Sequence, residues 1–403
     1  MQLHHGTPQD AGMLPDRVEH VKALARTWVE DGPHPALVVL AARRGVIFLH
    51  EALGTLRPDA DSPPLEKDSI FPMMSATKPV TAACVLALVE DGKVGLTWPV
   101  RDYFPEITGE GTDQILVHHL LCHLSGWRDI DVGREQLRRR EEGGERPPIE
   151  PGQDKGVAAY LHGAWATPLS APPGTVMEYS SLNYELLGEL VRRASDKPLD
   201  QFARERIFEP LGMKDSSYVL PPEHRERKVR RTEDLQGWFL GPLFPGADSE
   251  AFEADASGPG GLHLTALDYA IFTQMLLNGG RYGGRRILSR ASVDAMRRNH
   301  IPPGVPARVS FLGTDGSTLE KEFTGGYGYG LFPFEGTVTA KLNGGLVSPS
   351  SFSHTGALGI YWWADPERDL IGLYFSVCGL LPNETWNWRA DLFVDALTAS
   401  VEE

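Results

Sequence analysis

A serine and a lysine three residues apart are the first candidates for chemistry. Ser75 and Lys78 lie in the stretch 71–78, and an apolar run follows them. On a helix, residues at this spacing share one face. A lysine whose pKa is lowered by burial can take the proton of a serine hydroxyl, which is otherwise a weak nucleophile. The alternative is that Ser75 caps the helix and Lys78 is a surface charge. The catalytic interpretation gains weight because only one of the ten lysines has a serine three positions before it.

A tyrosine lies in a second stretch, 173–188, on an expected turn before a helix. From such a turn the hydroxyl of Tyr179 can point into a cleft. An ammonium beside it would favour the phenolate, so that the tyrosine can relay a proton. Taken alone, Tyr179 fits better with a half-buried core tyrosine whose hydroxyl is hydrogen-bonded.

A third stretch, Ser353-His354-Thr355-Gly356-Ala357, comes just before an expected strand. A glycine next to a strand lets a ligand approach the backbone. The side chains of Thr355 and His354 can then bind that ligand. The alternative is a turn that only leads the chain into the strand.

Four residues with metal-binding side chains offer a competing interpretation: His118, His119, Cys122 and His123. On a helix His119 and His123 share one face, which is suitable geometry for zinc. The Glu of a His-Glu-x-x-His motif is missing between them, so we expect no metal site. The chain also has no Gly-x-Ser-x-Gly motif, which disfavours an α/β-hydrolase, and no phosphate-binding glycine-rich loop.

The elements that must position these residues follow from the hydrophobic patterns. Expected helices cover residues 15–31, 75–91, 115–123, 182–194, 198–208, 265–277, 289–298 and 384–401, and expected strands cover 36–42, 46–49, 327–334, 359–363 and 370–377. This order predicts a sheet lobe built from both ends of the chain. A mainly helical lobe is inserted between them, and the active cleft would lie between the two lobes.

Two segments are expected to be irregular. Residues 134–151 are charged and rich in Pro and Gly, which predicts an exposed, mobile insertion. Residues 231–261 form a long stretch without a periodic pattern, and loops of this length are usually functional or disordered. Trp238 and Phe239 lie in it and are candidates for an apolar wall of the substrate site.

Composition and charge limit the classes of function that this chain can have. The chain has 403 residues with a formal net charge of −15, which disfavours nucleic-acid binding as the main function. Three cysteines, Cys84, Cys122 and Cys378, are too few for a disulfide framework. No apolar run is long enough for a membrane span, and the first residues do not look like a secretory signal. We therefore expect a cytoplasmic protein without membrane association.

Taken together, the three stretches resemble the serine β-lactamase and penicillin-binding protein superfamily. The likeness is greatest to its class C β-lactamase-like branch, which includes family VIII carboxylesterases. The Ser-x-x-Lys motif matches Ser75 and Lys78. The Tyr-x-Asn motif matches residues 179–181, with Ser181 where asparagine is usual. The Lys-Thr-Gly motif, often His-Thr-Gly in this branch, matches residues 354–356.

The resemblance implies roles for these residues. Ser75 attacks an acyl carbon, and Lys78 and Tyr179 share the general base and acid work. The backbone N–H groups of Ser75 and Ala357 form the oxyanion hole. The implied substrate-binding residues are Ser181, His354, Thr355 and Gly356, with Trp238 and Phe239 as the apolar wall. No metal or organic cofactor is implied.

The resemblance also implies an α+β fold of the β-lactamase/DD-peptidase type. Its antiparallel sheet is flanked by N- and C-terminal helices, and a mainly helical lobe is inserted. Residues 1–70 and 220–403 would form the sheet lobe, and residues 71–219 the helical lobe with the three catalytic residues. The leading function is a carboxylesterase that acts on small neutral acyl esters. A β-lactamase, a D-stereospecific peptidase, an acyltransferase and a slowly acylated penicillin-binding protein without turnover remain open. The sequence does not indicate an oligomeric state.

Overall fold

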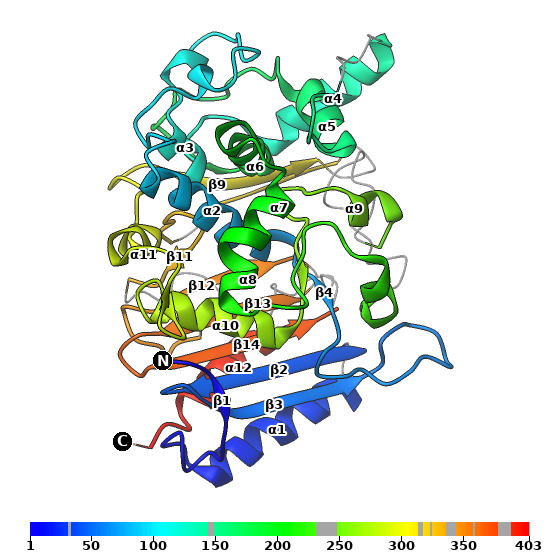
Figure 1. Cartoon of the computed structure of the whole chain (residues 1–403), viewed down its shortest axis with the longest axis vertical. Coiled ribbons are helices and arrows are strands. Elements are labelled where there is room, and N and C mark those ends of the chain that lie inside the picture. The colour runs from blue at the N-terminus through cyan, green and yellow to red at the C-terminus, as the bar shows by residue number, and fades with distance from the viewer. Residues whose placement is uncertain are drawn as a thin grey trace.

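A seven-stranded sheet organises one end of the molecule (Figure 1). The computed structural model describes residues 1–30, 34–143, 149–230, 248–312, 317–322, 325–335, 344–357, 359–377 and 388–402. The strand order is β1-β3-β2-β14-β13-β12-β11, and every pairing except β1 with β3 is antiparallel. The strands are β1 (His4–His5), β2 (Ala36–Arg43), β3 (Val46–Gly54), β11 (Phe332–Pro333), β12 (Phe352–Gly356), β13 (Ile360–Asp365) and β14 (Leu370–Ser376).

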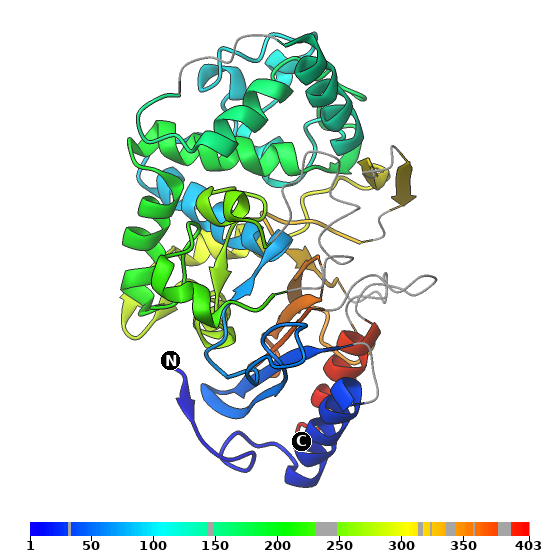
Figure 2. The ribbon, with the colours of Figure 1, turned by 90° about the vertical axis from the view of Figure 1, so that its right-hand side faces the viewer.

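The sheet joins the two ends of the chain. Strand β14 pairs with β2 along its whole length, from Leu370 opposite Arg43 to Ser376 opposite Leu37. All eight residues of β2 are buried, because helices cover both faces of the sheet. Figure 2 shows α1 (Pro15–Glu30) and α12 (Trp388–Thr398) side by side on the outer face. Helix α10 (Ala266–Leu277) contacts β2, β13 and β14, and its buried residues share the inner core with the helical lobe.

The middle of the chain is mainly helical, and α2 and α6 pack against each other there. The longer helices are α2 (Lys78–Glu90), α4 (Asp129–Glu142), α5 (Lys155–Ala164) and α6 (Ser181–Ser195). The shorter elements are β4 (Phe71–Pro72), η1 (Met74–Thr77), η2 (Val100–Asp102), η3 (Thr112–Gln114), α3 (Val117–Leu121), β5 (Met177–Tyr179), α7 (Leu199–Ala203), η4 (Arg204–Phe208), α8 (Glu209–Leu211) and η5 (Pro222–Arg227). This arrangement confirms the predicted α+β fold with an inserted helical lobe.

The remaining elements connect this middle region to the C-terminal strands of the sheet. They are α9 (Glu250–Ala254), β6 (His263–Leu264), β7 (Arg281–Tyr282), β8 (Arg285–Arg286), α11 (Arg290–Arg297), β9 (Ala307–Leu312) and β10 (Thr318–Glu322). Strands β10, β9 and β5 form a small sheet beside the helical lobe, and β5 runs parallel to β9. Within the described residues no helix is long and apolar enough to cross a membrane.

The prediction of an irregular segment over 134–151 is wrong for its first part, because α4 continues to Glu142. Charged side chains one turn apart stabilise this helix. Arg138 pairs with Glu135 at 2.7 Å and with Glu142 at 2.5 Å, and Arg139 pairs with Glu135 at 2.9 Å. A run that looked like a solvated loop is therefore a helix with its charges on the surface.

Other expected boundaries shift. The strand expected over 327–334 shrinks to β11, in a region with glycines at 325, 326, 328 and 330. The helix expected over 115–123 shrinks to α3, and His123 beyond it has a positive φ of 58°. Part of the long stretch 231–261 is ordered as α9. Trp238, Phe239 and Cys378 lie outside the described residues.

Candidate active site

Ser75 and Lys78 face each other across one helical turn. Ser75 lies in η1, and Lys78 begins α2 directly after it. The Lys78 Nζ donates to the Ser75 Oγ at 3.0 Å and to the carbonyl oxygen of Pro259 at 3.1 Å. The lysine is 1% exposed, so it is not the surface charge of the alternative interpretation.

Burial changes the acid–base properties of this lysine. It lowers the pKa of Lys78 to about 7, although the negative charges of Asp129 and Glu185 act in the opposite direction. Near neutral pH a substantial fraction of Lys78 therefore has a free electron pair. The hydrogen bond to Ser75 gives the serine proton a direct path to that amine.

The turn that carries Ser75 is held by the chain around Leu262. The Met73 N–H donates to the Leu262 carbonyl at 2.8 Å, and the Leu262 N–H donates to the Thr77 Oγ1 at 3.1 Å. Met74 has a φ of 51°, which is unusual for a residue with a side chain. Strain of this kind is found at functional sites, where the surrounding structure fixes it.

Tyr179 lies over the lysine at the end of β5. The Lys78 Nζ is 4.8 Å from the centroid of its ring, and Tyr179 itself is 9% exposed. Burial raises the pKa of the Tyr179 hydroxyl, and a hydrogen bond with Ser75 offsets part of this rise. The hydroxyl is therefore protonated in the resting site and lies beside Ser75, while Lys78 contacts the ring.

His123 holds the backbone on both sides of Tyr179. Its carbonyl oxygen accepts the Glu178 N–H at 2.8 Å, and its ring Nδ1 accepts the Ser180 N–H at 3.1 Å. The His123 ring also packs on the Tyr179 ring, with 4.4 Å between centroids. Burial and the Lys78 charge hold the pKa of His123 well below its usual range, so the ring is a neutral support.

His354 is completely buried on β12 and is uncharged. Its Nδ1 lies 2.7 Å from the Thr355 carbonyl, and its Nε2 lies 3.4 Å from the Tyr327 hydroxyl. Burial, with repulsion from Lys78, lowers the pKa of His354 to about 3. The side chain of Thr355 donates to the Ile360 carbonyl at 3.0 Å.

Gly356 brings β12 against the turn of the serine. A Cβ on this glycine would lie 2.1 Å from the carbonyl oxygen of Met73, a distance that no side chain tolerates. The close approach therefore needs glycine, and it places Ala357 at the end of the strand beside the turn that carries Ser75. Ala357 is 5% exposed.

We expect Gly356→Ala to lower kcat at least about tenfold and to reduce Tm, because overpacking a tight contact costs about 1–3 kcal/mol. The added methyl would push β12 away from Met73 and also meets the Ile360 Cβ at 3.0 Å. Steady-state kinetics and thermal unfolding check both effects. Gly345→Ala is the control, since its Cβ would be 3.9 Å from the nearest atom. Full activity of Gly356→Ala would show that the close approach is unnecessary.

The structure brings together Ser75, Lys78 and Tyr179, with His354 near enough to Lys78 for electrostatic repulsion. Ser181 begins α6, and its side chain is partly exposed. Sequence reasoning missed four contributors, whose signals were weak or absent: His123, Asp129, Glu185 and the carbonyl of Pro259. His123 entered the sequence analysis only as a candidate metal ligand.

The histidines and cysteine considered for zinc make other contacts. The Nδ1 of His118 lies 2.8 Å from the Tyr329 hydroxyl, and the Nδ1 of His119 accepts the Leu116 N–H at 3.2 Å. The Cys122 thiol donates to the His118 carbonyl at 3.0 Å. Within the described parts of the chain, no group of three or more His, Cys, Asp or Glu residues could hold a metal ion.

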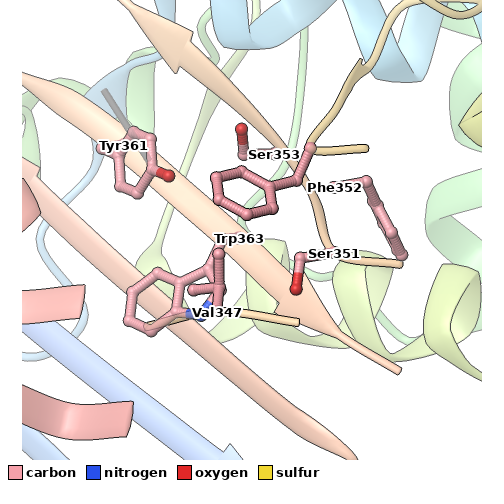
Figure 3. A pocket seen from close by; sticks show the side chains of 7 residues that line it. Val347, Ser351, Phe352, Ser353, Tyr361 and Trp363 are labelled. Carbon is pink, nitrogen blue, oxygen red and sulfur yellow. The ribbon is translucent and has the colours of Figure 1, made fainter. Parts of the chain in front are cut away.

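A small pocket beside β12 belongs to the other face of the sheet (Figure 3). Directly paired residues share a face, so His354 faces the same side as its partner Trp362, and Ser353 the same side as Trp363. Trp363 packs on Phe393 of α12, in the outer layer. The pocket is lined by Phe334, Val347, Ser351, Phe352, Ser353, Tyr361 and Trp363. It therefore lies apart from Ser75.

Comparison with known proteins identifies the family. A family model described as Beta-lactamase matches residues 21–384. This chain belongs to the β-lactamase family. It is a serine hydrolase of the β-lactamase and penicillin-binding protein type, as the motifs predicted. Protein Rv1367c of Mycobacterium tuberculosis is 32% identical over 336 residues, which cover 77% of this chain and 78% of that protein. Esterase EstB of Burkholderia gladioli is 33% identical over 189 residues, or 45% of this chain and 46% of the esterase.

Solved structures of the β-lactamase family confirm the fold. A penicillin-binding protein homologue from Caulobacter crescentus superposes with a TM-score of 0.73 at 22% identity, over 96% of this chain and 99% of the homologue. A family VIII carboxylesterase superposes with a TM-score of 0.71 at 20% identity, over 96% and 99% of the two chains.

Proposed function

We propose that this protein is a carboxylesterase that hydrolyses small neutral acyl esters through an acyl-enzyme on Ser75. The observation that carries the mechanism is the contact of 3.0 Å between the Ser75 hydroxyl and the buried Lys78 amine. The proton of Ser75 passes to the Lys78 Nζ as the Oγ forms a bond to the ester carbonyl carbon. The C–O bond to the alcohol then breaks, and the alcohol leaves with a proton delivered through Lys78 and Tyr179.

Water completes the cycle in the second half of the reaction. The same base removes a proton from water, the hydroxyl attacks the acyl carbon, and the bond to Ser75 breaks. Ser75 recovers its proton and the carboxylic acid leaves. The backbone N–H groups of Ser75 and Ala357 are the proposed oxyanion donors. The closeness of β12 to the serine turn, which Gly356 permits, supports this assignment.

The preference for neutral esters rests on the charges of the site. His354 stands where many relatives have a lysine that would help to hold a substrate carboxylate, and its low pKa keeps it uncharged. Ser181 lacks the amide of the usual asparagine. Asp129 and Glu185 act on Lys78 as negative charges. The similarity to esterase EstB and to a family VIII carboxylesterase supports an ester substrate.

We expect kcat/KM for p-nitrophenyl butyrate to exceed that for nitrocefin or a D-Ala-D-Ala peptide. The expected ratio is about 10- to 100-fold, the value of one charge-assisted hydrogen bond. Parallel steady-state assays measure it. Faster turnover of either carboxylate substrate would make the esterase assignment wrong and favour a β-lactamase or a peptidase. A single stoichiometric burst with every substrate would instead indicate a penicillin-binding protein without turnover.

A further inference from the structure

A partly buried carboxylate lies behind the strand that carries Tyr179. Asp129 is the first residue of α4, and its Oδ1 accepts hydrogen bonds from the Ser180 hydroxyl and the Ser181 N–H, both at 2.7 Å. Its Oδ2 is 2.9 Å from the same Ser181 nitrogen. Ser180 directly follows Tyr179, so Asp129 fixes the chain where the strand turns into α6.

The same carboxylate interacts electrostatically with Lys78. Burial raises the pKa of Asp129, whereas the two serine donors and the Lys78 charge lower it. In return, the charge of Asp129 raises the pKa of Lys78 against the effect of burial. The N-terminal end of α4 also favours a negative charge at this position.

A further acidic side chain, Glu185, also acts on Lys78. Glu185 comes from α6, and its Oε1 accepts the Ser257 hydroxyl at 2.6 Å while its Oε2 accepts the Gly258 N–H at 3.2 Å. Burial raises the pKa of Glu185 to about 7. The titratable groups around Lys78 that are neutral at pH 7 are His123, Tyr179, Tyr184 and His354.

We propose that Asp129 is a positioning residue of the active site: through its hydrogen bonds with Ser180 and Ser181 it fixes the chain that follows Tyr179, and it supplies a negative charge that acts on the Lys78 ammonium. The inference rests on the proposed function, in which Lys78 must be neutral to take the serine proton. The charge of Asp129 raises the pKa of Lys78 and so opposes the effect of burial. Without this charge, the pKa of Lys78 falls below about 7. The base form is then populated at lower pH.

The variant Asp129→Asn removes the negative charge and keeps the shape of the side chain. The amide oxygen can still accept hydrogen bonds from the Ser181 N–H and the Ser180 hydroxyl, as Oδ1 does in the unmodified protein. The readout is the rate at which a fluorophosphonate labels Ser75 between about pH 5 and pH 9, which needs no ester substrate. We expect the midpoint of the acid limb to fall by about one pH unit. Asp129→Ala should show the same shift and, because the support behind Tyr179 is lost, a plateau roughly tenfold lower.

Asp131→Asn is the matched control, on the same helix and with the same chemical change. Asp131 pairs with Arg128 at 2.7 Å and is not among the charges that act on Lys78. The acid limb of the labelling rate in this variant should have the same midpoint as in the unmodified protein. Glu185→Gln tests whether Glu185 is the titrating group. A limb that belongs to Glu185 should disappear in this variant. A limb that belongs to Lys78 should remain, at a lower pH, because the charge of Glu185 raises the pKa of Lys78.

Three outcomes would overturn the inference: an unchanged midpoint in Asp129→Asn, an equal shift in Asp131→Asn, or a limb that disappears in Glu185→Gln. Thermal unfolding of each variant excludes a general loss of folding. Ester turnover is measured separately. If Ser75 is labelled normally but esters are not turned over, the esterase assignment is rejected and the proposed role of Asp129 is unaffected. Failure to label Ser75 at any pH would reject the proposed nucleophile and the role of Asp129 with it.

Discussion

Replacing Ser75 with alanine is expected to abolish ester hydrolysis, with a loss in kcat of at least about 1,000-fold, because no covalent intermediate can form. A fluorophosphonate should add one label to the unmodified protein, and peptide mass mapping should place it on Ser75. The alanine variant should take up no label. The fold should be retained, since the Ser75 side chain is partly exposed.

Ser195→Ala is a matched control for this experiment. Ser195 is also partly exposed and helical, and its hydroxyl donates to the Val191 carbonyl at 2.6 Å, away from Lys78. This variant should be labelled and should turn over esters normally. If Ser75→Ala is labelled as fast as the unmodified protein, the nucleophile is a different residue.

The second large effect concerns Lys78 and Tyr179 as one unit. Lys78→Ala and Tyr179→Phe should each lower kcat by at least about 100-fold, the usual value of general acid–base catalysis. Both groups contact Ser75 and each other, so their losses should not add. The double variant should be little slower than the worse single variant.

The measurement is a double-mutant cycle on kcat under conditions where all four proteins are folded. Losses that multiply fully would argue that the two side chains act in separate steps. A Tyr179→Phe variant with normal kcat would remove the tyrosine from the mechanism and leave Lys78 as the sole base.

Sequence reasoning worked best where the chemistry is local. Ser75 and Lys78 are three residues apart, so their contact follows from helix geometry alone. The motifs around Tyr179 and His354 required a resemblance, because these residues reach the serine from distant parts of the chain. The charge state of His354 depends on burial under Tyr327 and Phe332, which no spacing reveals.

Physical reasons explain why the sequence did not indicate the contributors that were missed. Pro259 acts through its carbonyl oxygen, a group that every residue has. Asp129 is hydrogen-bonded to Ser181, which is 52 positions away in the sequence. An aspartate at the start of a helix is also common simply because its charge stabilises that helix. The fold was easier to predict, because fully apolar runs such as β2 indicate a strand buried on both faces.

The position of β14 between β2 and β13 has a consequence during synthesis. Ala42 pairs with Ile371, so at about 5–20 residues per second the ribosome takes roughly 15–65 s to supply the missing partner. Until then, β2 has β3 on one edge and an unpaired apolar edge on the other. The helical middle of the chain can pack during this interval, whereas the sheet cannot close. We therefore expect nascent chains that stop before β14 to bind chaperones or aggregate.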